Sequence, residues 1–198
     1  MVARTKRAST PTLAPTPRHW KLTADQYQRM GETSILHEDD RVELLEGELY
    51  EMSPIGDWHN SCVDRFTWRL GADLGGRAIL RIQGSFRLSP SSEPQPDILV
   101  LRFRPDFYLN APPGPQDVLL LIEVADASLA YDRDFKLPLY ARAGIPEVWI
   151  ANRLAERFEV YRDPKDGAYR SMTFVERGGS VSPVAFPDLT IQVKEILG

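Results

Sequence analysis

The chain has 198 residues and a mass of 22.4 kDa, which fits one domain with an ordinary hydrophobic core. Its hydrophobic fraction of 42% is that of a soluble globular protein, and no apolar run approaches the roughly 18 residues of a membrane span. The single cysteine, Cys62, excludes an internal disulfide. The N-terminus has no apolar signal region, so we expect a cytoplasmic protein without membrane contact.

The charge balance bears on possible partners. The formal net charge is −4 at pH 7, whereas domains that bind nucleic acid tend to be basic. Residues 1–18 hold four basic side chains and no acid, and their Ser, Thr and Pro content predicts a disordered tail ahead of a single domain over 19–198. Without these four charges the balance of −4 becomes −8, which either solubilises the surface or must be overcome by a local basic strip. The candidates for such a strip are Arg81, Arg87, Arg102 and Arg104.

The first part of the domain predicts a helix, a hairpin and a second helix. Thr23–Gln26 resembles a capping box that opens a short helix, which Gly31 would close. Residues 41–52 alternate around a Glu-Gly turn, as in a β-hairpin. Asp57 can cap the next helix, whose apolar residues recur at helical spacing until Gly75-Gly76.

The middle of the chain predicts three strands. Residues 78–88 predict the first, in which Gly84 indicates a bulge or a close backbone approach. Ile98–Leu101 and Val118–Ile122 are continuous apolar runs, typical of neighbouring strands in a buried sheet. A Pro-rich loop joins these two runs.

The last part returns to a helix and then to strands. A helical stretch follows Ser128 and reaches Gly144, and Pro138 fits best in the first turn of a helix that begins near Leu137. Further β segments are predicted at residues 147–151, 157–161, 169–175 and 189–193. This order predicts an α/β sandwich, a mixed central β-sheet flanked by helices, with additional β-hairpins.

Two carboxylates stand beside the apolar runs of the predicted sheet. Asp97 precedes the first run and Glu123 ends the second, so adjacent strands would bring both to one edge. An aspartate at a strand end is often only a turn former, but an ionised glutamate beside a buried run needs a partner or a metal. Hard divalent cations such as Mg²⁺, with Mn²⁺ as a substitute, take oxygen ligands of this kind. We therefore expect Asp97 and Glu123 to be catalytic metal ligands.

Lys136 and Asp132 have i,i+4 spacing in the predicted helix. In isolation this spacing is typical of a surface pair worth about 0.2–0.5 kcal/mol. Alternatively, the helix crosses the sheet edge and delivers the ammonium to the carboxylates, where it could orient water or neutralise phosphate charge in the transition state. We expect Lys136 to be a catalytic residue and Asp132 to be an auxiliary residue of the site. We expect most glutamates of the first hairpin to be solvated charges at a sheet edge. Among them, Glu43 is our candidate for a third acid that binds the metal.

Two further polar residues are auxiliary candidates. His59 falls in the first turn of a predicted helix, where a capping or surface histidine is the simpler interpretation. Gln83 falls inside a predicted strand and could bond water or substrate, although a cross-strand hydrogen bond is the plainer role. Other chemistries lack their motifs, because there is no glycine-rich phosphate loop and no G-x-S-x-G elbow. Three scattered histidines and one cysteine do not make a zinc site.

Several short motifs stand in a specific order between residues 22 and 169. They are Val42–Leu49, His59 opening a helix, Ser92–Asp97, Ile122–Asp126 and the stretch Asp132–Ile150. In these motifs the chain resembles the Uma-two family of restriction-endonuclease-like nucleases, a branch of the PD-(D/E)XK superfamily. The resemblance implies a helix-flanked sheet with Asp97 and Glu123 as Mg²⁺ ligands.

The resemblance also accounts for the position of the lysine. In the superfamily the lysine usually stands two residues after the glutamate, where this chain has Ala125, and in this branch it matches Lys136 on the following helix. Two positions depart from the family pattern. Asn152 replaces an aspartate that usually ends the next strand, and Val148 replaces a tyrosine that often precedes its tryptophan.

Three functional hypotheses stay open at this point. The first is an Mg²⁺-dependent endonuclease that hydrolyses DNA phosphodiester bonds, expected as a homodimer because related enzymes often cut two strands with two subunits. The second is a non-catalytic DNA-binding or assembly module, which the acidic balance favours and the retained Asp97, Glu123 and Lys136 disfavour. The third, a metal-dependent hydrolase of small phosphoesters, lacks a recognisable pocket signature.

Overall fold

The computed structural model describes residues 19–37 and 39–198, so the tail expected at residues 1–18 lies outside the described residues. The helices are α1 (Ala24–Glu32), α2 (Asp57–Leu74), the short 3-10 helix η1 (Pro115–Asp117), α3 (Leu129–Tyr131), the π-helix η2 (Asp132–Lys136), α4 (Leu137–Arg142) and α5 (Val193–Leu197). The strands are β1 (Val42–Leu45), β2 (Glu48–Glu51), β3 (Ala78–Ile82), β4 (Ile98–Arg102), β5 (Val118–Ala125), β6 (Glu147–Asn152), β7 (Arg157–Lys165), β8 (Ala168–Glu176), β9 (Ser180–Val181) and β10 (Ile191–Gln192). Among these described elements, no helix is both long and apolar enough to cross a membrane.

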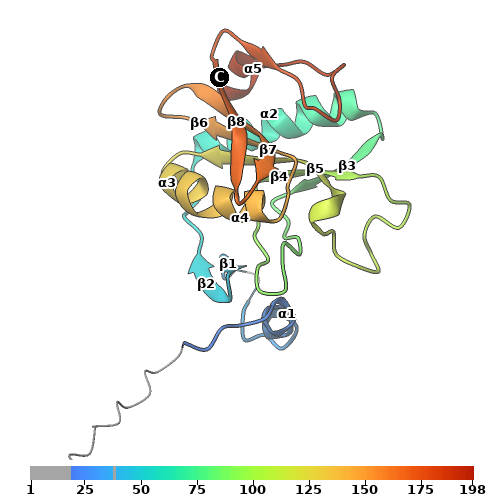
Figure 1. Cartoon of the computed structure of the whole chain (residues 1–198), viewed down its shortest axis with the longest axis vertical. Helices are drawn as coiled ribbons and strands as arrows, with labels where there is room; N and C mark the ends of the chain where they lie inside the picture. The colour runs from blue at the N-terminus through green and yellow to red at the C-terminus, as the bar shows by residue number, and fades with distance from the viewer. Residues whose placement is uncertain (1–18, 38) are drawn as a thin grey trace, which may run out of the picture.

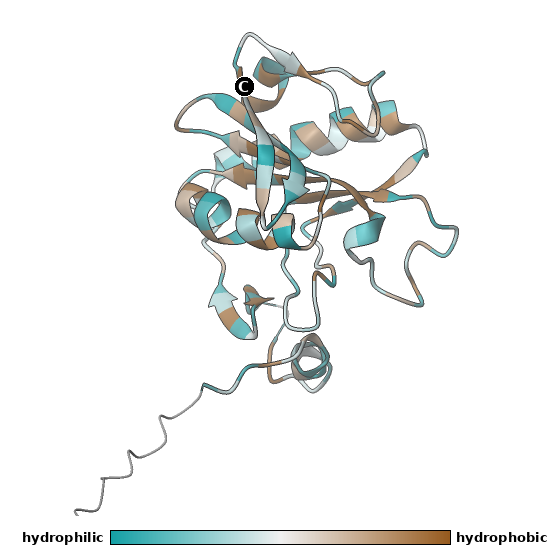
Figure 2. Cartoon of the chain, viewed as in Figure 1, coloured by the Kyte–Doolittle hydropathy of each residue, from teal (hydrophilic) through white to brown (hydrophobic). Residues whose placement is uncertain are grey.

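Six strands form one central sheet, in the order β3-β4-β5-β6-β7-β8 (Figure 1). β5 and β6 run parallel, and the other neighbouring pairs are antiparallel. The parallel pair requires a crossover connection, which α3, η2 and α4 supply. The central strands are strongly hydrophobic in Figure 2, as expected for strands covered on both faces. The mixed sheet predicted from the sequence is confirmed.

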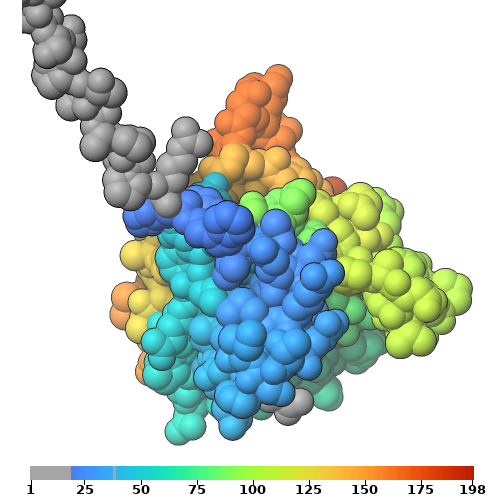
Figure 3. Space-filling model, turned by 90° about the horizontal axis from the view of Figure 1, so that it is seen from below, coloured from blue at the N-terminus to red at the C-terminus, as the bar shows by residue number. Residues whose placement is uncertain are grey.

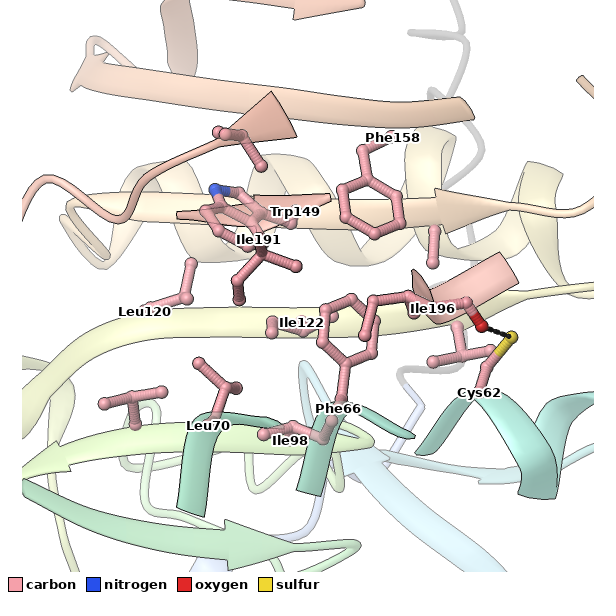
Figure 4. Close-up of a cluster of buried hydrophobic side chains, with 14 of the residues drawn as sticks. Cys62, Phe66, Leu70, Ile98, Leu120, Ile122, Trp149, Phe158, Ile191 and Ile196 are labelled. Atoms are coloured by element: carbon pink, nitrogen blue, oxygen red, sulfur yellow. Dashed lines mark hydrogen bonds between the residues drawn. The ribbon is translucent and has the colours of Figure 1, made fainter. Parts of the chain in front are cut away.

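One face of the sheet packs against α2 and α5. Phe66 and Trp149 both stack on Phe158, with ring centroids 5.4 and 6.0 Å away (Figure 4). The thiol of Cys62 in α2 donates a hydrogen bond to the carbonyl of Ile196 in α5. Burial raises the pKa of this thiol to about 12, so the cysteine acts as a packing residue.

The other face packs against α4 and the β1–β2 hairpin. Leu45 of β1, Leu99 of β4 and Tyr140 of α4 are among the buried side chains of this layer. A β-bridge between Leu44 and Glu93, together with a hydrogen bond from the N–H of Gly47 to the carbonyl of Ser91, holds the hairpin against the chain that leads into β4. This layer brings the hairpin, the start of β4 and the crossover helices to the same end of the sheet.

Local sequence signals place the helix starts well. The predicted capping box is present, with Thr23 accepting from the backbone of Gln26 and the Gln26 side chain accepting in return. Asp57 is the first residue of α2 rather than its cap, because the capping position belongs to Gly56. Pro138 lies in the first turn of α4, as predicted.

Three strand boundaries differ from the prediction. β3 ends at Ile82 instead of continuing to residue 88, because Gln83 adopts a left-handed conformation with a φ of 48° that a strand does not hold. The β7–β8 hairpin is longer than expected and projects from the body in Figure 3. The strand expected at 189–193 is reduced to β10, because α5 begins at Val193.

Candidate active site

Asp97 and Glu123 are neighbours at one end of the β4–β5 pair. Ile98 pairs with Ile122 in the antiparallel register, so the two acids that adjoin this pair also lie close together. The backbone N–H of Val124 donates to Oδ2 of Asp97 at 2.8 Å and ties the start of β4 to the end of β5. The convergence expected from the two apolar runs is thus produced by the strand register.

The ammonium of Lys136 lies inside this group of acids. Its Nζ is 2.8 Å from Oε1 of Glu123, 3.5 Å from Oε2 of Glu43 and 3.9 Å from Oδ1 of Asp132. The lysine is only 3% exposed, so the surface-pair interpretation of Asp132 and Lys136 is wrong. Both residues belong to the π-helix η2, a wide turn of the kind often found at functional sites.

Burial controls the protonation of the cluster. Burial raises the pKa of Glu123 to about 8, because it outweighs the attraction of Lys136, and the charges of Asp132 and Asp97 act in the same direction as burial. Burial alone would lower the pKa of Lys136, but Glu123 and the other acids around it hold that pKa well above its ordinary value. Burial likewise raises the pKa of Asp132. The cluster therefore carries more acids than one ammonium can balance, and it favours a proton or a further cation.

Glu43 reaches the cluster from β1. The hydroxyl of Tyr131 donates to its Oε1 at 3.0 Å, and the backbone N–H of Gln95 donates to its Oε2 at 3.0 Å. In the described part of the chain, no group of three or more His, Cys, Asp or Glu side chains is placed to hold a metal ion. The structure places Glu43 beside the lysine rather than in a three-acid metal cluster.

Two of the three auxiliary candidates, His59 and Gln83, contact Asp97. Nε2 of His59 lies 2.9 Å from Oδ1 of Asp97, and the histidine side chain is 13% exposed, so it is not a surface histidine. The backbone N–H of Gln83 donates to the carbonyl of Asp97 at 2.8 Å from a position beyond the end of β3. A left-handed φ at a residue other than glycine is strained, and such strain clusters at functional sites.

The sequence prediction lacks one site residue, Tyr140. Its hydroxyl donates to Oε1 of Glu123 at 2.7 Å, the same oxygen that Lys136 contacts. Asp132, Lys136 and Tyr140 are spaced four residues apart, which is the available signal, because residues at this spacing share a helix face.

The expected basic strip does not gather at these acids. Arg102 and Arg104 lie at the end of β4 opposite Asp97, where the following loop projects in Figures 1 and 3. Arg104 is paired with an aspartate at 2.8 Å, and Arg87 is paired with another at 2.7 Å. Arg87 and Arg104 therefore neutralise local acids, whereas Arg81 and Arg102 donate to the backbone carbonyls of Ser85 and Gln116.

The donor set suits a divalent cation of the magnesium type. Mg²⁺ is usually held by one or two carboxylates together with water and substrate phosphates, not by a cage of protein ligands. Asp97 and Glu123 offer two such carboxylates. The hydroxyl of Tyr140 and the ammonium of Lys136 both contact Oε1 of Glu123. The residues present therefore fit a metal that substrate and water would help to coordinate.

Comparison with known proteins identifies the family and the fold of this chain. The Uma2 family model, described as "Putative restriction endonuclease", matches residues 24–194. The chain belongs to the Uma2 family. The Uma2 chain is also similar to a crystal structure described as "a putative nuclease belonging to DUF820" from Anabaena variabilis ATCC 29413, with a TM-score of 0.65 and 16% identity over 89% of this chain and 97% of that chain. At that identity the likeness shows a shared fold, and no curated protein sequence matches the chain.

One departure of this Uma2 chain from the family pattern has a structural explanation. Asn152 donates to the buried carboxylate of Glu159 at 2.7 Å and accepts from the backbone N–H of Ala155 at 3.0 Å. Arg133 and Tyr161 also donate to Glu159. Burial alone would raise the pKa of Glu159, but these hydrogen bonds hold it below its ordinary value. Asn152 thus belongs to a separate, satisfied polar cluster outside the candidate site.

Proposed function

We propose that this protein is a metal-dependent endonuclease that hydrolyses DNA phosphodiester bonds with Mg²⁺, or with Mn²⁺ in its place. The observation that carries the proposal is the buried ammonium of Lys136 against Glu123, on the strand next to Asp97. Membership of the Uma2 family, described as "Putative restriction endonuclease", supports the same chemistry.

In this proposal, each residue of the cluster has a defined task. Asp97 and Glu123 would hold the cation, which would supply Lewis-acid chemistry for the hydrolysis of a phosphodiester. Lys136 stabilises the negative charge that develops on the phosphate in the transition state. The hydroxyl of Tyr140 fixes the orientation of the Glu123 carboxylate, and His59 does the same for Asp97.

Cleavage of plasmid, single-stranded DNA and RNA with Mg²⁺ or Mn²⁺ tests the proposal. Asp97→Asn and Glu123→Gln keep the side-chain shapes and remove one ligand charge each, so we expect each to lower the cleavage rate ~100-fold or more. Asp188→Asn is the matched control, because Asp188 is an exposed acid paired with Arg77. Cleavage that persists in both site variants would refute the assignment of the site.

A homodimer in the cytoplasm completes the proposal, because two subunits would cut the two strands of a duplex. Sedimentation of the protein on a short duplex measures this directly. Double-strand cleavage by a species that sediments as one subunit per duplex would contradict the dimer.

The acidic balance of −4 supports a second candidate, a non-catalytic DNA-binding or assembly module that retains the fold. This candidate predicts that the protein binds DNA and leaves every DNA and RNA form intact with either ion. The cleavage assay described above therefore separates the two functions.

A further inference from the structure

A small pocket adjoins the candidate active site. Its volume is about 100 Å³, and it lies between the segment before α2 and the segment after β5. Its lining includes Arg41, Gly56, His59, Asp126 and Ser128. Two of these residues also contact the candidate acids, because His59 lies against Asp97 and the hydroxyl of Ser128 donates to Asp132 at 2.6 Å. The pocket is therefore a neighbour of the site and shares His59 with it.

Arg41 gives this pocket a positive charge and N–H donors that have no partner among the described residues. Its guanidinium makes one hydrogen bond, to the carbonyl of Ser53 at 2.9 Å, and it has no ion pair among residues 19–37 and 39–198. An arginine fork has five N–H donors, so among the described residues most of them have no partner. Asp126, the acid in the lining, is already neutralised by Arg153. Within the described part of the chain, the pocket thus presents a cation without a carboxylate partner.

The start of α2 also favours an anion. The 18-residue helix α2 begins at the pocket, and its capping residue, Gly56, has no side chain to bond the free N–H groups. The exposed Asp57 in the first turn is the one acid of that helix start.

We propose that this pocket binds one phosphate group of the nucleic-acid backbone, next to the scissile phosphate, with Arg41 as its principal donor. The inference rests on the proposed function, since it names where the same substrate is held. A pocket of about 100 Å³ accepts a phosphate group but is too small for a nucleoside, because pockets for small organic ligands measure roughly 300–1,000 Å³. Such a contact positions the strand without reading its sequence.

Arg41→Gln and Arg170→Gln form a matched pair of variants. The first removes the charge from the pocket and keeps a donor for the carbonyl of Ser53. The second removes the same charge from an exposed arginine on β8. The measurement is the fluorescence anisotropy of a labelled short DNA duplex, with Ca²⁺ in place of Mg²⁺, over a series of salt concentrations.

We expect Arg41→Gln to weaken binding about tenfold and to reduce the slope of log Kd against log salt by about one, because one phosphate contact is lost. Arg41→Lys restores the charge and should recover most of the affinity, and Arg170→Gln should bind as the wild type does. Thermal unfolding midpoints equal to that of the wild type establish that the variants are folded.

A second measurement uses the wild-type protein, so it does not depend on the folding of a variant. The DNA ligands are duplexes that each carry one neutral methylphosphonate linkage. This linkage removes one backbone charge at a different position in each duplex. We expect wild-type binding to weaken strongly at one linkage next to the cleavage position, and Arg41→Gln to be indifferent to that linkage. Equal losses at every linkage would contradict a discrete pocket.

The outcomes separate the pocket from the proposed function. Unchanged affinity and salt slope in Arg41→Gln would overturn the pocket even where the wild type cleaves DNA. Binding that depends on Arg41, in a wild-type protein that cleaves nothing with Mg²⁺ or Mn²⁺, would support the pocket and overturn the endonuclease. A wild-type protein that binds no DNA would overturn the pocket as a substrate site.

Discussion

Nζ of Lys136 lies 2.8 Å from Oε1 of Glu123, and both side chains are buried where β5 meets the crossover helices. A buried pair of this kind gains little over apolar side chains, but loss of one partner leaves an unpaired charge in the interior. Lys136 therefore serves as the internal counter-ion of the acids around it. This relationship couples the stability of the fold to the chemistry of the site.

Lys136→Met is expected to lower the free energy of unfolding by about 3–5 kcal/mol, because it leaves the acids around the ammonium uncompensated. Urea unfolding measures the loss, and Lys194→Met, at an exposed position of α5, is the control. The double variant Lys136→Met/Glu123→Gln should recover much of the stability and none of the cleavage. A Lys136→Met protein as stable as the wild type would contradict the counter-ion role of Lys136.

Tyr140→Phe removes the hydroxyl that donates to Glu123 at 2.7 Å, and Tyr161→Phe removes one that donates to Glu159 at the same distance. Each is expected to cost about 1–3 kcal/mol of unfolding free energy, because a buried carboxylate loses one donor. Calorimetric titration with Mn²⁺ should show about tenfold weaker binding for Tyr140→Phe alone, since only that hydroxyl orients a proposed ligand. Equal metal affinities in the two variants would argue that Tyr140 has a purely structural role.

Metal affinity is expected to rise with pH up to about 8. Burial raises the pKa of Glu123 to about 8 from an ordinary value of 4.5, so the metal must displace a proton at lower pH. Below pH 8 each unit should weaken Mn²⁺ binding up to about tenfold, as calorimetry at several pH values would measure. Affinity that is flat with pH would show that Glu123 is already ionised or is not a ligand.

The same raised pKa predicts the stability of the metal-free protein. The folded state holds the Glu123 proton more tightly than the unfolded chain does, so this contribution to stability is complete below pH 4.5 and is lost as pH rises through about 8. Glu123→Gln removes the titration, so the difference in unfolding free energy between wild type and variant isolates it. A difference that grows in favour of the wild type with rising pH would have the wrong sign.

Gln83→Gly is expected to stabilise the protein by about 0.5–1 kcal/mol relative to Gln83→Ala, because glycine adopts the left-handed φ of 48° without strain. Thermal unfolding of the two variants measures this difference. If the amide of Gln83 contacts water or substrate, both variants should lose cleavage activity to the same extent. Loss in the alanine variant alone would instead assign the effect to the backbone.

Much of the fold follows from local patterns in this chain. The runs Ile98–Leu101 and Val118–Ile122 are typical of strands in a buried sheet, and they form β4 and β5. The capping box at Thr23 and the glycines after residue 74 mark helix ends, because both act within a single turn. The end of β3 was predicted wrongly, because the turn at Gln83 is held by a bond to Asp97 from the neighbouring strand.

The sequence by itself determined that Asp97 and Glu123 adjoin two buried strands, because each stands beside an apolar run. They meet because those strands pair in antiparallel register. Only the tertiary structure decided the places of Lys136 and His59. Each has a plain surface interpretation in its own segment, as one member of a helix pair or as a histidine at a helix start. A buried charge becomes favourable only when an opposite charge arrives from a distant segment, and that energy has no local signature in the sequence.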